Sequence, residues 1–312
     1  MGEPLLLVIL GPTASGKSTL AISLAQQFSG EIVSCDSVAV YRNFEIGTAK
    51  PSRAERALVP HHLVDAAEPG EPFTAGDYAR RARAVIAEIA ARGKLPIVVG
   101  GTGLYLRALL QGLFPGPQRS EALRARLREK IALRGSPYLH RVLSRLDPPS
   151  AAQIHGNDAA KLIRGVEICL AARRPMSQLW QQGRDLLRGY KVLRIGLNPP
   201  REQLYERVNQ RASLMFQHGL IEETGALLER YTALSASTPF SALGYKQAVR
   251  HLRGELTLDE AISATQQGHR NYAKRQMTWF RREPEVIWLA GFGDDPAIAQ
   301  QAVELVRASL DL

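Results

Sequence analysis

Residues 5–18 read Leu5-Leu6-Leu7-Val8-Ile9-Leu10-Gly11-Pro12-Thr13-Ala14-Ser15-Gly16-Lys17-Ser18, and they indicate the fold class more strongly than any other segment. The apolar run is typical of a buried strand, and the residues after it match the pattern G-x-x-x-x-G-K-[ST]. A strand that passes through such a loop into a helix directs several backbone N–H groups at one anion, at the positive end of the helix dipole. Lys17 adds a cation, and Ser18 offers a hydroxyl to Mg²⁺. Gly11–Ser18 is therefore predicted to bind a diphosphate.

Further strands with the same character follow along the chain. Glu31–Cys35 and Leu95–Val99 are apolar runs, and a helix over Ala75–Arg92, with Thr74 as its N-cap, precedes the second. Alternating strands and helices predict an α/β fold with a parallel sheet flanked by helices. The carboxyl ends of parallel strands share one edge. We expect the turns Cys35–Ser37 and Gly100–Gly103 to meet Gly11–Ser18 there.

The excess of positive over negative charge lies in the middle of the chain. The chain has 312 residues and a formal net charge of +10, and residues 116–200 alone hold 16 Lys and Arg against 6 Asp and Glu. Such a segment favours a polyanionic partner, above all a nucleic acid. Phe114–Pro117 marks a boundary, followed by helical patterns over Ser120–Leu133, Pro137–Leu146 and Ala159–Ala172. We predict a core of residues 1–115 and 192–312 and a basic all-helical insertion over 116–191.

The segment after the insertion returns to the core pattern. Val192–Leu197 and Val286–Ala290 are expected to be strands, and Arg201–Tyr231 mostly helical. A capping box at Thr257–Glu260 opens a helix that can extend to Arg282. The two cysteines are too few for a disulfide framework, and no apolar stretch reaches the length of a membrane span. A cytoplasmic protein without a membrane partner, and a monomer, is expected.

Asp36 and Thr102 are the candidate reactive side chains at the strand ends. An Asp in that position is either a turn residue or a functional group that faces the diphosphate loop, namely a general base or a carboxylate that contacts Mg²⁺ through one of its ligands. Thr102 either binds substrate or is an ordinary loop residue at the start of a helix. His61 and His62 are adjacent and cannot share a strand or helix face, so a metal pair is not expected.

A basic and aromatic stretch covers residues 268–282. It holds five Lys and Arg and no acidic residue, with aromatic side chains between them. Such a stretch suits phosphate contacts and base stacking, and it equally suits an amphipathic helix with a solvated basic face.

Taken together, these residues resemble the bacterial tRNA dimethylallyltransferases, also called tRNA isopentenylpyrophosphate transferases. The resemblance covers nearly the whole chain. It is carried in order by Gly11–Ser18, Asp36-Ser37 with Val40-Tyr41, Ile46–Pro51, Pro60–Asp65, Val99–Tyr105, His155 with Asn157-Asp158, Gly244-Tyr245, Ala273–Gln276 and Thr278-Trp279.

The resemblance implies a P-loop NTPase-like fold whose loop holds the diphosphate of dimethylallyl diphosphate. The exocyclic N6 of the adenine on the 3′ side of the anticodon then attacks the allylic carbon, and diphosphate leaves. Asp36 is implied as the base and Thr102 as a residue that holds the reacting groups. Arg211 is implied as a further diphosphate contact, and Ser18 as a ligand of Mg²⁺, the implied cofactor.

The resemblance also implies that the helical insertion binds the anticodon stem-loop of tRNA. The implied tRNA-binding residues are Asp36, Ser37, Val38, Ala39, Thr102, Arg124, Ala160, Lys161, Leu162, Ile163, Arg164, Lys274 and Arg275. The chain departs from the family pattern at Ala39, Gly156 and Lys161, where Gln, Pro and Arg are usual.

Other functions remain open on the sequence alone. A P-loop kinase of a small metabolite, or an isopentenyltransferase that uses free adenosine phosphates, would have the same loop, although neither explains the basic segment. A non-catalytic RNA-binding protein with a nucleotide switch is the third alternative. Such a switch normally needs an apolar strand that ends in Asp, to which only Ile32–Asp36 comes near.

Overall fold

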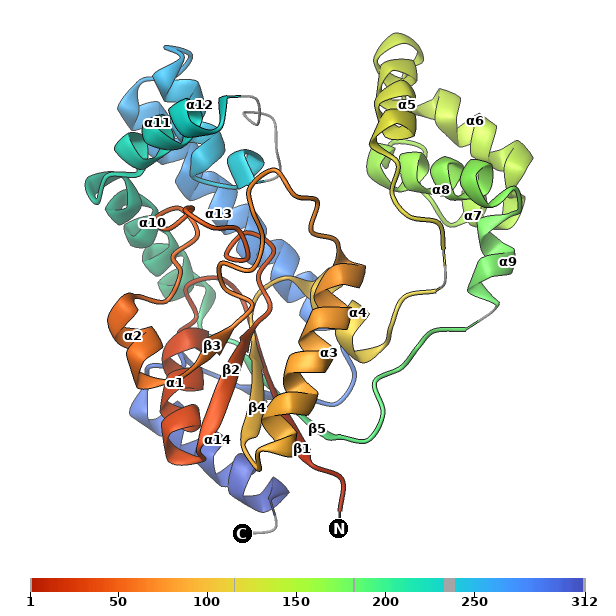
Figure 1. Cartoon of the computed structure of the whole chain (residues 1–312). Helices are drawn as coiled ribbons and strands as arrows, with labels where there is room; N and C mark the ends of the chain where they lie inside the picture. Colours follow the sequence, from red (N-terminus) through yellow and green to blue (C-terminus); the bar gives the residue numbers. More distant parts are fainter. Residues whose placement is uncertain (1, 115, 182, 233–238, 311–312) are drawn as a thin grey trace. The chain divides into compact units, whose positions relative to one another are not determined.

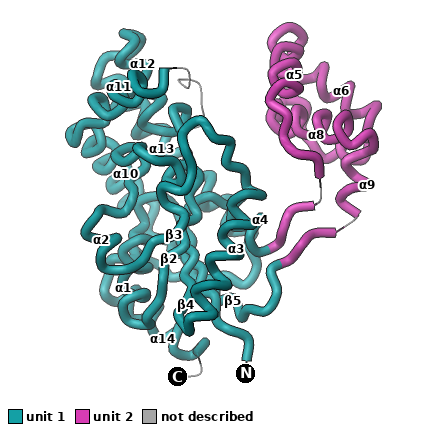
Figure 2. Tube along the Cα trace, viewed as in Figure 1, with its two compact units in different colours: residues 1–110, 187–312 teal, residues 111–186 magenta. Residues whose placement is uncertain are grey.

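The chain forms two compact units in a computed structural model, which describes residues 2–114, 116–181, 183–232 and 239–310. Unit 1 consists of Met1–Leu110 and Leu187–Leu312, and unit 2 of Gln111–Leu186 (Figure 2). The sequence analysis placed the two boundaries slightly later, at 115/116 and 191/192. Both ends of unit 2 leave unit 1 at one point, because Leu187 N donates a hydrogen bond to Leu110 O at 3.0 Å.

The described part of unit 1 contains a six-stranded parallel sheet in the order β3-β2-β4-β1-β5-β6 (Figure 1). The strands are β1 (Leu5–Leu10), β2 (Gly30–Ser34), β3 (His61–His62), β4 (Leu95–Val99), β5 (Lys191–Leu197) and β6 (Val286–Leu289). The predicted α/β fold with a parallel sheet is confirmed. The short β3 was not predicted, because two adjacent histidines carry no apolar pattern.

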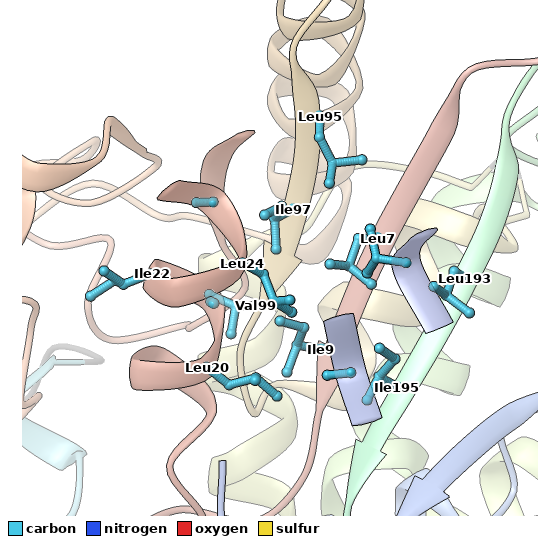
Figure 3. Packing of buried hydrophobic residues seen from close by; sticks show 14 of the residues in the cluster. Leu7, Ile9, Leu20, Ile22, Leu24, Leu95, Ile97, Val99, Leu193 and Ile195 are labelled. Carbon is cyan, nitrogen blue, oxygen red and sulfur yellow. The ribbon is translucent and has the colours of Figure 1, made fainter. Parts of the chain in front are cut away.

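Both faces of the sheet are covered, which is why its central strands are continuous apolar runs. Leu5, Leu7 and Ile9 of β1 point to one face and pack with α1 (Lys17–Gln27) and α14 (Pro296–Ser309) (Figure 3). Leu6 and Val8 point to the other face, against α3 (Ala75–Ala91) and α4 (Gly103–Leu110). The alternation follows from the two-residue period of a strand. Packing on both faces fixes the sheet, in which the carboxyl ends of β2, β4 and β1 are neighbours.

Helices at the carboxyl edge of the sheet form a second core within unit 1. They are α10 (Arg201–Gln217), α11 (Leu220–Arg230), α12 (Tyr245–Leu252) and α13 (Leu258–Phe280). A further short helix, α2 (Arg53–Leu58), lies earlier in the chain. Phe44, Phe240 and Tyr245 make edge-to-face contacts in this core, with centroids 4.9–5.0 Å apart. The predicted N-caps Thr74 and Thr257 both form complete capping boxes.

Unit 2 is all-helical and has a core of its own. Its helices are α5 (Glu121–Arg134), α6 (Ser136–Leu146), α7 (Pro148–Ala152), α8 (Ala159–Ala172) and α9 (Met176–Trp180). Leu143 and Leu162 are fully buried between α6 and α8. Glu167 is also fully buried and is bound by Arg124 and Arg164. Within the described ranges of both units, no helix is at once long and apolar enough to cross a lipid bilayer.

Candidate active site

The glycine-rich loop has the geometry of an anion cradle. Gly11 and Gly16 have φ values of 150° and 82°, and Ala14 also has a positive φ, of 63°. Gly16 is the N-cap of α1, so the loop ends directly on the positive end of that helix. Lys17 Nζ donates a hydrogen bond to Pro12 O at 2.6 Å. Burial, and secondly the charge of Arg211, lower the pKa of Lys17 from 10.5 to about 7, against an opposing effect of Asp36.

Asp36 follows β2 and lies within electrostatic reach of this loop, since its charge raises the pKa of both Lys17 and Arg211. Its Oδ1 accepts hydrogen bonds from Val38 N at 2.8 Å and Ala39 N at 3.1 Å. Among the described residues, no group donates to the second oxygen, Oδ2. The carboxylate is thus oriented through one oxygen and presents the other.

Thr102 joins the turn after β4 to the turn after β2. Its Oγ1 accepts from Ser37 N at 3.1 Å and donates to Ser37 Oγ at 3.4 Å, and Thr102 N donates to Cys35 O at 3.2 Å. The buried thiol of Cys35 has its pKa raised to about 12, chiefly by burial. Cys35 is therefore a packing residue beside the site, and Thr102 fixes the backbone next to Asp36.

Gln276 of α13 connects the third turn. Its Oε1 accepts from Thr13 N at 2.8 Å, and its Nε2 donates to Gly101 O at 3.0 Å. Tyr272, one helical turn earlier, donates to the same carbonyl at 3.4 Å. The three turns at the sheet edge are thus held together, as the sequence predicted. The bridging role of Gln276 was missed, although its spacing from Tyr272 places both on one helix face.

Arg211 of α10 contacts the loop, and His269 of α13 lies within electrostatic reach of Arg211. Arg211 Nη1 donates to Thr13 Oγ1 at 3.4 Å, and burial lowers the pKa of Arg211 while the carboxylate of Asp36 opposes that effect. His269 is buried, and burial together with the charge of Arg211 lowers its pKa to about 4. His269 is therefore neutral at physiological pH. The sequence analysis did not single it out.

A cavity of about 830 Å³ opens beside Arg211. Apolar side chains of Ile46, Leu214 and Met215 form part of its wall, together with the cations Lys50 and Arg56. Lys50 has a side chain only 1% exposed, and it donates to Asp65 at 2.6 Å and to Tyr41 O at 2.6 Å. Lys50 and Asp65, both in motifs that carry the family resemblance, thus hold the loop after β2 in place.

The predicted tRNA-binding residues fall into two groups. Ala160, Lys161, Lys274 and Arg275 are exposed, while Asp36, Ser37, Val38, Thr102, Arg124 and Arg164 are partly exposed. Leu162, Ile163 and Ala39 have exposed fractions of 0%, 6% and 5%. Their side chains pack in the protein interior, so the predicted contacts of these three residues with tRNA would have to use their backbone. The apolar pattern of α8 buries every such position that faces α6.

The chemistry of the available ligands suits Mg²⁺. Ser18 has an exposed hydroxyl at the start of α1, and Asp36 supplies a carboxylate across the sheet edge. Mg²⁺ prefers such oxygen ligands and keeps much of its shell for water and substrate phosphates. Within the described residues, no three His, Cys, Asp or Glu side chains cluster as a protein-only metal site requires.

A family model described as IPP transferase matches residues 39–283. The chain belongs to this family. A protein named tRNA dimethylallyltransferase from Koribacter versatilis is 63% identical over 99% of this chain and 100% of its own length. Its namesake from Solibacter usitatus is 55% identical, over 98% of this chain and 99% of its own length.

Solved structures of family members agree with the fold. The tRNA isopentenylpyrophosphate transferase of Bacillus halodurans aligns with a TM-score of 0.73 at 36% identity, covering 98% of this chain and 97% of its own. A eukaryotic dimethylallyltransferase acting on tRNA aligns with a TM-score of 0.84 at 26% identity, covering 99% of this chain and 80% of its own.

Proposed function

We propose that this IPP transferase family member transfers a dimethylallyl group from dimethylallyl diphosphate to N6 of the adenine 3′ of the anticodon in tRNA. The products are N6-dimethylallyladenosine and diphosphate. One observation carries the proposal. The loop Gly11–Ser18 and the carboxylate of Asp36, whose Oδ2 accepts no hydrogen bond from the described residues, lie at the same edge of the sheet. Hydrogen bonds of Thr102 and Gln276 connect the turns that carry them. The names of the full-length relatives support the same reaction.

The loop Gly11–Ser18 would hold the leaving group. As the allylic C–O bond breaks, negative charge develops on the diphosphate, and preorganised donors stabilise that charge at little cost of reorganisation. Backbone N–H groups of the loop, Lys17 and Arg211 are the donors available there. The cavity beside Arg211 is lined in part by Ile46, Leu214 and Met215, which suits the apolar isoprenyl group. Mg²⁺ held through Ser18 would neutralise further charge on the diphosphate.

Asp36 would act as the base. The adenine amino group is a weak nucleophile because its lone pair is delocalised into the ring. As N6 forms its bond to the allylic carbon, one N6 proton passes to Asp36 Oδ2, and the electron pair of the C–O bond leaves with diphosphate. Val38 and Ala39 hold the other oxygen, so the carboxylate is already oriented.

Unit 2 would bind the anticodon stem-loop. Its surface is rich in arginine and lysine, which suits the phosphate backbone of RNA. The target base must leave its stack to reach a site at the edge of a sheet. A tRNA substrate in a bacterial relative also implies a cytoplasmic protein, and the monomeric state stays a prediction.

One assay separates the proposed function from its alternatives. The protein is incubated with Mg²⁺, labelled dimethylallyl diphosphate and either tRNA or AMP. Label in tRNA is the expected result. Label in AMP instead would identify an adenylate isopentenyltransferase. ATP turnover without transfer of label would contradict prenylation altogether and favour a kinase or a nucleotide switch.

A further inference from the structure

A loop after the last strand packs against the outer side of the diphosphate loop. Gly293, which follows β6, donates its backbone N–H to Ser15 O at 2.9 Å. Phe292 is 7% exposed and belongs to a small apolar cluster with Leu204 and Val208 of α10, against which Ala14 packs. Residues 292–294, which we term the closing loop, therefore contact the loop that would hold diphosphate, in the same unit.

The hydrogen bond from Gly293 fixes a peptide plane. In a trans peptide the carbonyl of one residue and the N–H of the next point in opposite directions. Because Ser15 O is bound by the closing loop, the N–H of Gly16 points to the other side of the diphosphate loop. That is the side on which an anion held by the N–H groups of the loop would lie.

The two loops lie too close for side chains between them. A Cβ atom on Gly293 would lie 2.5 Å from Gly16 O, and one on Gly16 would lie 2.7 Å from Asp294 Oδ1. The closing loop is thus fitted to this loop at the level of the backbone. Glycine at these positions is explained by the close approach as well as by the positive φ of Gly16.

Arg207 of α10 holds the closing loop in place. Its Nη1 donates to both carboxylate oxygens of Asp294, at 2.7 and 2.8 Å. Its guanidinium carbon also lies 3.7 Å from the centroid of the Phe292 ring. Arg211, one turn further along α10, contacts Thr13 on the same diphosphate loop. One helix therefore supports that loop directly through Arg211 and indirectly through Arg207.

We propose that Arg207 and Asp294 are positioning residues that orient the Ser15–Gly16 peptide for diphosphate binding. This inference rests on the proposed function for the identity of the anion. Neither side chain needs to touch substrate. Their pair keeps Gly293 on Ser15 O, so that the Gly16 amide is already directed at the anion before it binds, which lowers the cost of binding.

The test measures the binding of inorganic pyrophosphate by calorimetry, in the full chain with Mg²⁺. Arg207→Ala and Asp294→Ala should each weaken pyrophosphate binding about tenfold, the size expected for one misdirected hydrogen bond to a charged ligand. KM for dimethylallyl diphosphate should rise in parallel, while affinity for tRNA stays unchanged. The exchanged pair Arg207→Asp/Asp294→Arg should recover part of the loss.

The ion pair between Arg250 of α12 and Glu255, which follows that helix, is the matched control. Its side chains are 43% and 46% exposed, against 42% and 39% for Arg207 and Asp294. Arg250→Ala should leave pyrophosphate affinity as in the unchanged protein. If the Arg207 and Asp294 variants bind pyrophosphate normally, the positioning role is refuted.

Milder variants cover the case in which an alanine variant does not fold. Asp294→Asn keeps the shape but loses the charge, and Arg207→Lys keeps the charge but loses the planar guanidinium that lies over the Phe292 ring. Normal pyrophosphate binding by these variants would equally refute the inference. Because this readout needs no tRNA, weakened binding in a protein that transfers no prenyl group would overturn the proposed function alone.

Discussion

The edge of the sheet in unit 1 and the surface of unit 2 treat charge in opposite ways. At the sheet edge, Lys17, Asp36 and Arg211 are partly buried and each is held by hydrogen bonds to neighbouring loops. In unit 2 most cations are exposed, namely Arg119, Arg126, Arg128, Lys130, Arg134, Arg141, Arg145, Lys161, Arg173, Arg174 and Arg184. The exceptions are Arg124 and Arg164, which are partly buried and flank the buried carboxylate of Glu167.

The difference indicates that charged groups have a different role in each unit. Partly buried, fixed groups interact strongly over short distances and can stabilise one particular charge distribution. Exposed, mobile cations are screened by salt and contribute a summed attraction with little geometric demand. We therefore expect substitutions at the sheet edge to change reaction and diphosphate binding, and substitutions on unit 2 to change tRNA affinity.

The largest expected effect is at Asp36. Asp36→Ala should lower the transfer rate about 100- to 10,000-fold, the range for loss of a general base, with tRNA affinity nearly unchanged. Asp36→Asn keeps an oxygen for Val38 and Ala39 but cannot accept the proton, so it should lose as much. Single-turnover kinetics with labelled donor measure both variants. An active Asn variant would mean that Asp36 only orients the turn.

Glu167 tests whether the buried charge in unit 2 is structural. Glu167→Ala should destabilise unit 2 by about 3–5 kcal/mol, because it leaves Arg124 and Arg164 without their shared partner. Hydrogen exchange over residues 111–186 measures the loss, and pyrophosphate binding should not change. Glu121, 54% exposed and paired with Arg119 and Arg128, is the control. A comparable loss for Glu121→Ala would contradict the distinction between buried and exposed pairs.

Lys17 tests the sheet edge through pH. Its pKa of about 7 means that free protein loses this proton as pH rises through 7, while bound diphosphate favours the cation. Pyrophosphate affinity should therefore fall above pH 7, by up to about tenfold per pH unit. Calorimetry from pH 6 to 9 measures the slope, and Lys17→Met shows the titration of pyrophosphate alone. Equal slopes in the two proteins would refute the prediction.

The same shift has a consequence for stability. Between about pH 7 and the unfolded value of 10.5, the unfolded chain binds a proton at Lys17 that the folded chain does not. Lys17 therefore makes the free energy of unfolding rise with pH through this window. Urea titrations of the unchanged protein and of Lys17→Met should diverge there.

Lys161 tests the smallest effect, on the surface of unit 2. It is exposed, and among the described residues its Nζ is paired only with Asp158, at 2.7 Å. Lys161→Ala should weaken tRNA binding modestly and reduce the slope of log affinity against log salt by about 0.7–0.9, the value for one phosphate contact. Lys94, exposed ahead of β4 at the opposite edge of the sheet, is the control. An unchanged slope for Lys161→Ala would remove it from the interface.

Local pattern was enough to predict the strands and the turns that carry Asp36 and Thr102. Leu5–Leu10 and Leu95–Val99 are found at the predicted bounds, because buried parallel strands are uninterrupted apolar runs. Gln276 and the closing loop were not predicted. Their contacts with Thr13 and Ser15 join residues more than 260 positions apart, and nothing in either local sequence encodes the partner.

The single backbone contact between Leu110 and Leu187 has a bearing on how this architecture can vary. To unit 1, all of Gln111–Leu186 is one closed loop, and the entropy of closing a loop grows only with the logarithm of its length. The stability of the sheet therefore depends only weakly on the number of residues between Leu110 and Leu187. A helix added to unit 2 or removed from it would change the closure entropy of this loop only slightly, so the length of unit 2 can vary with little effect on the stability of the sheet.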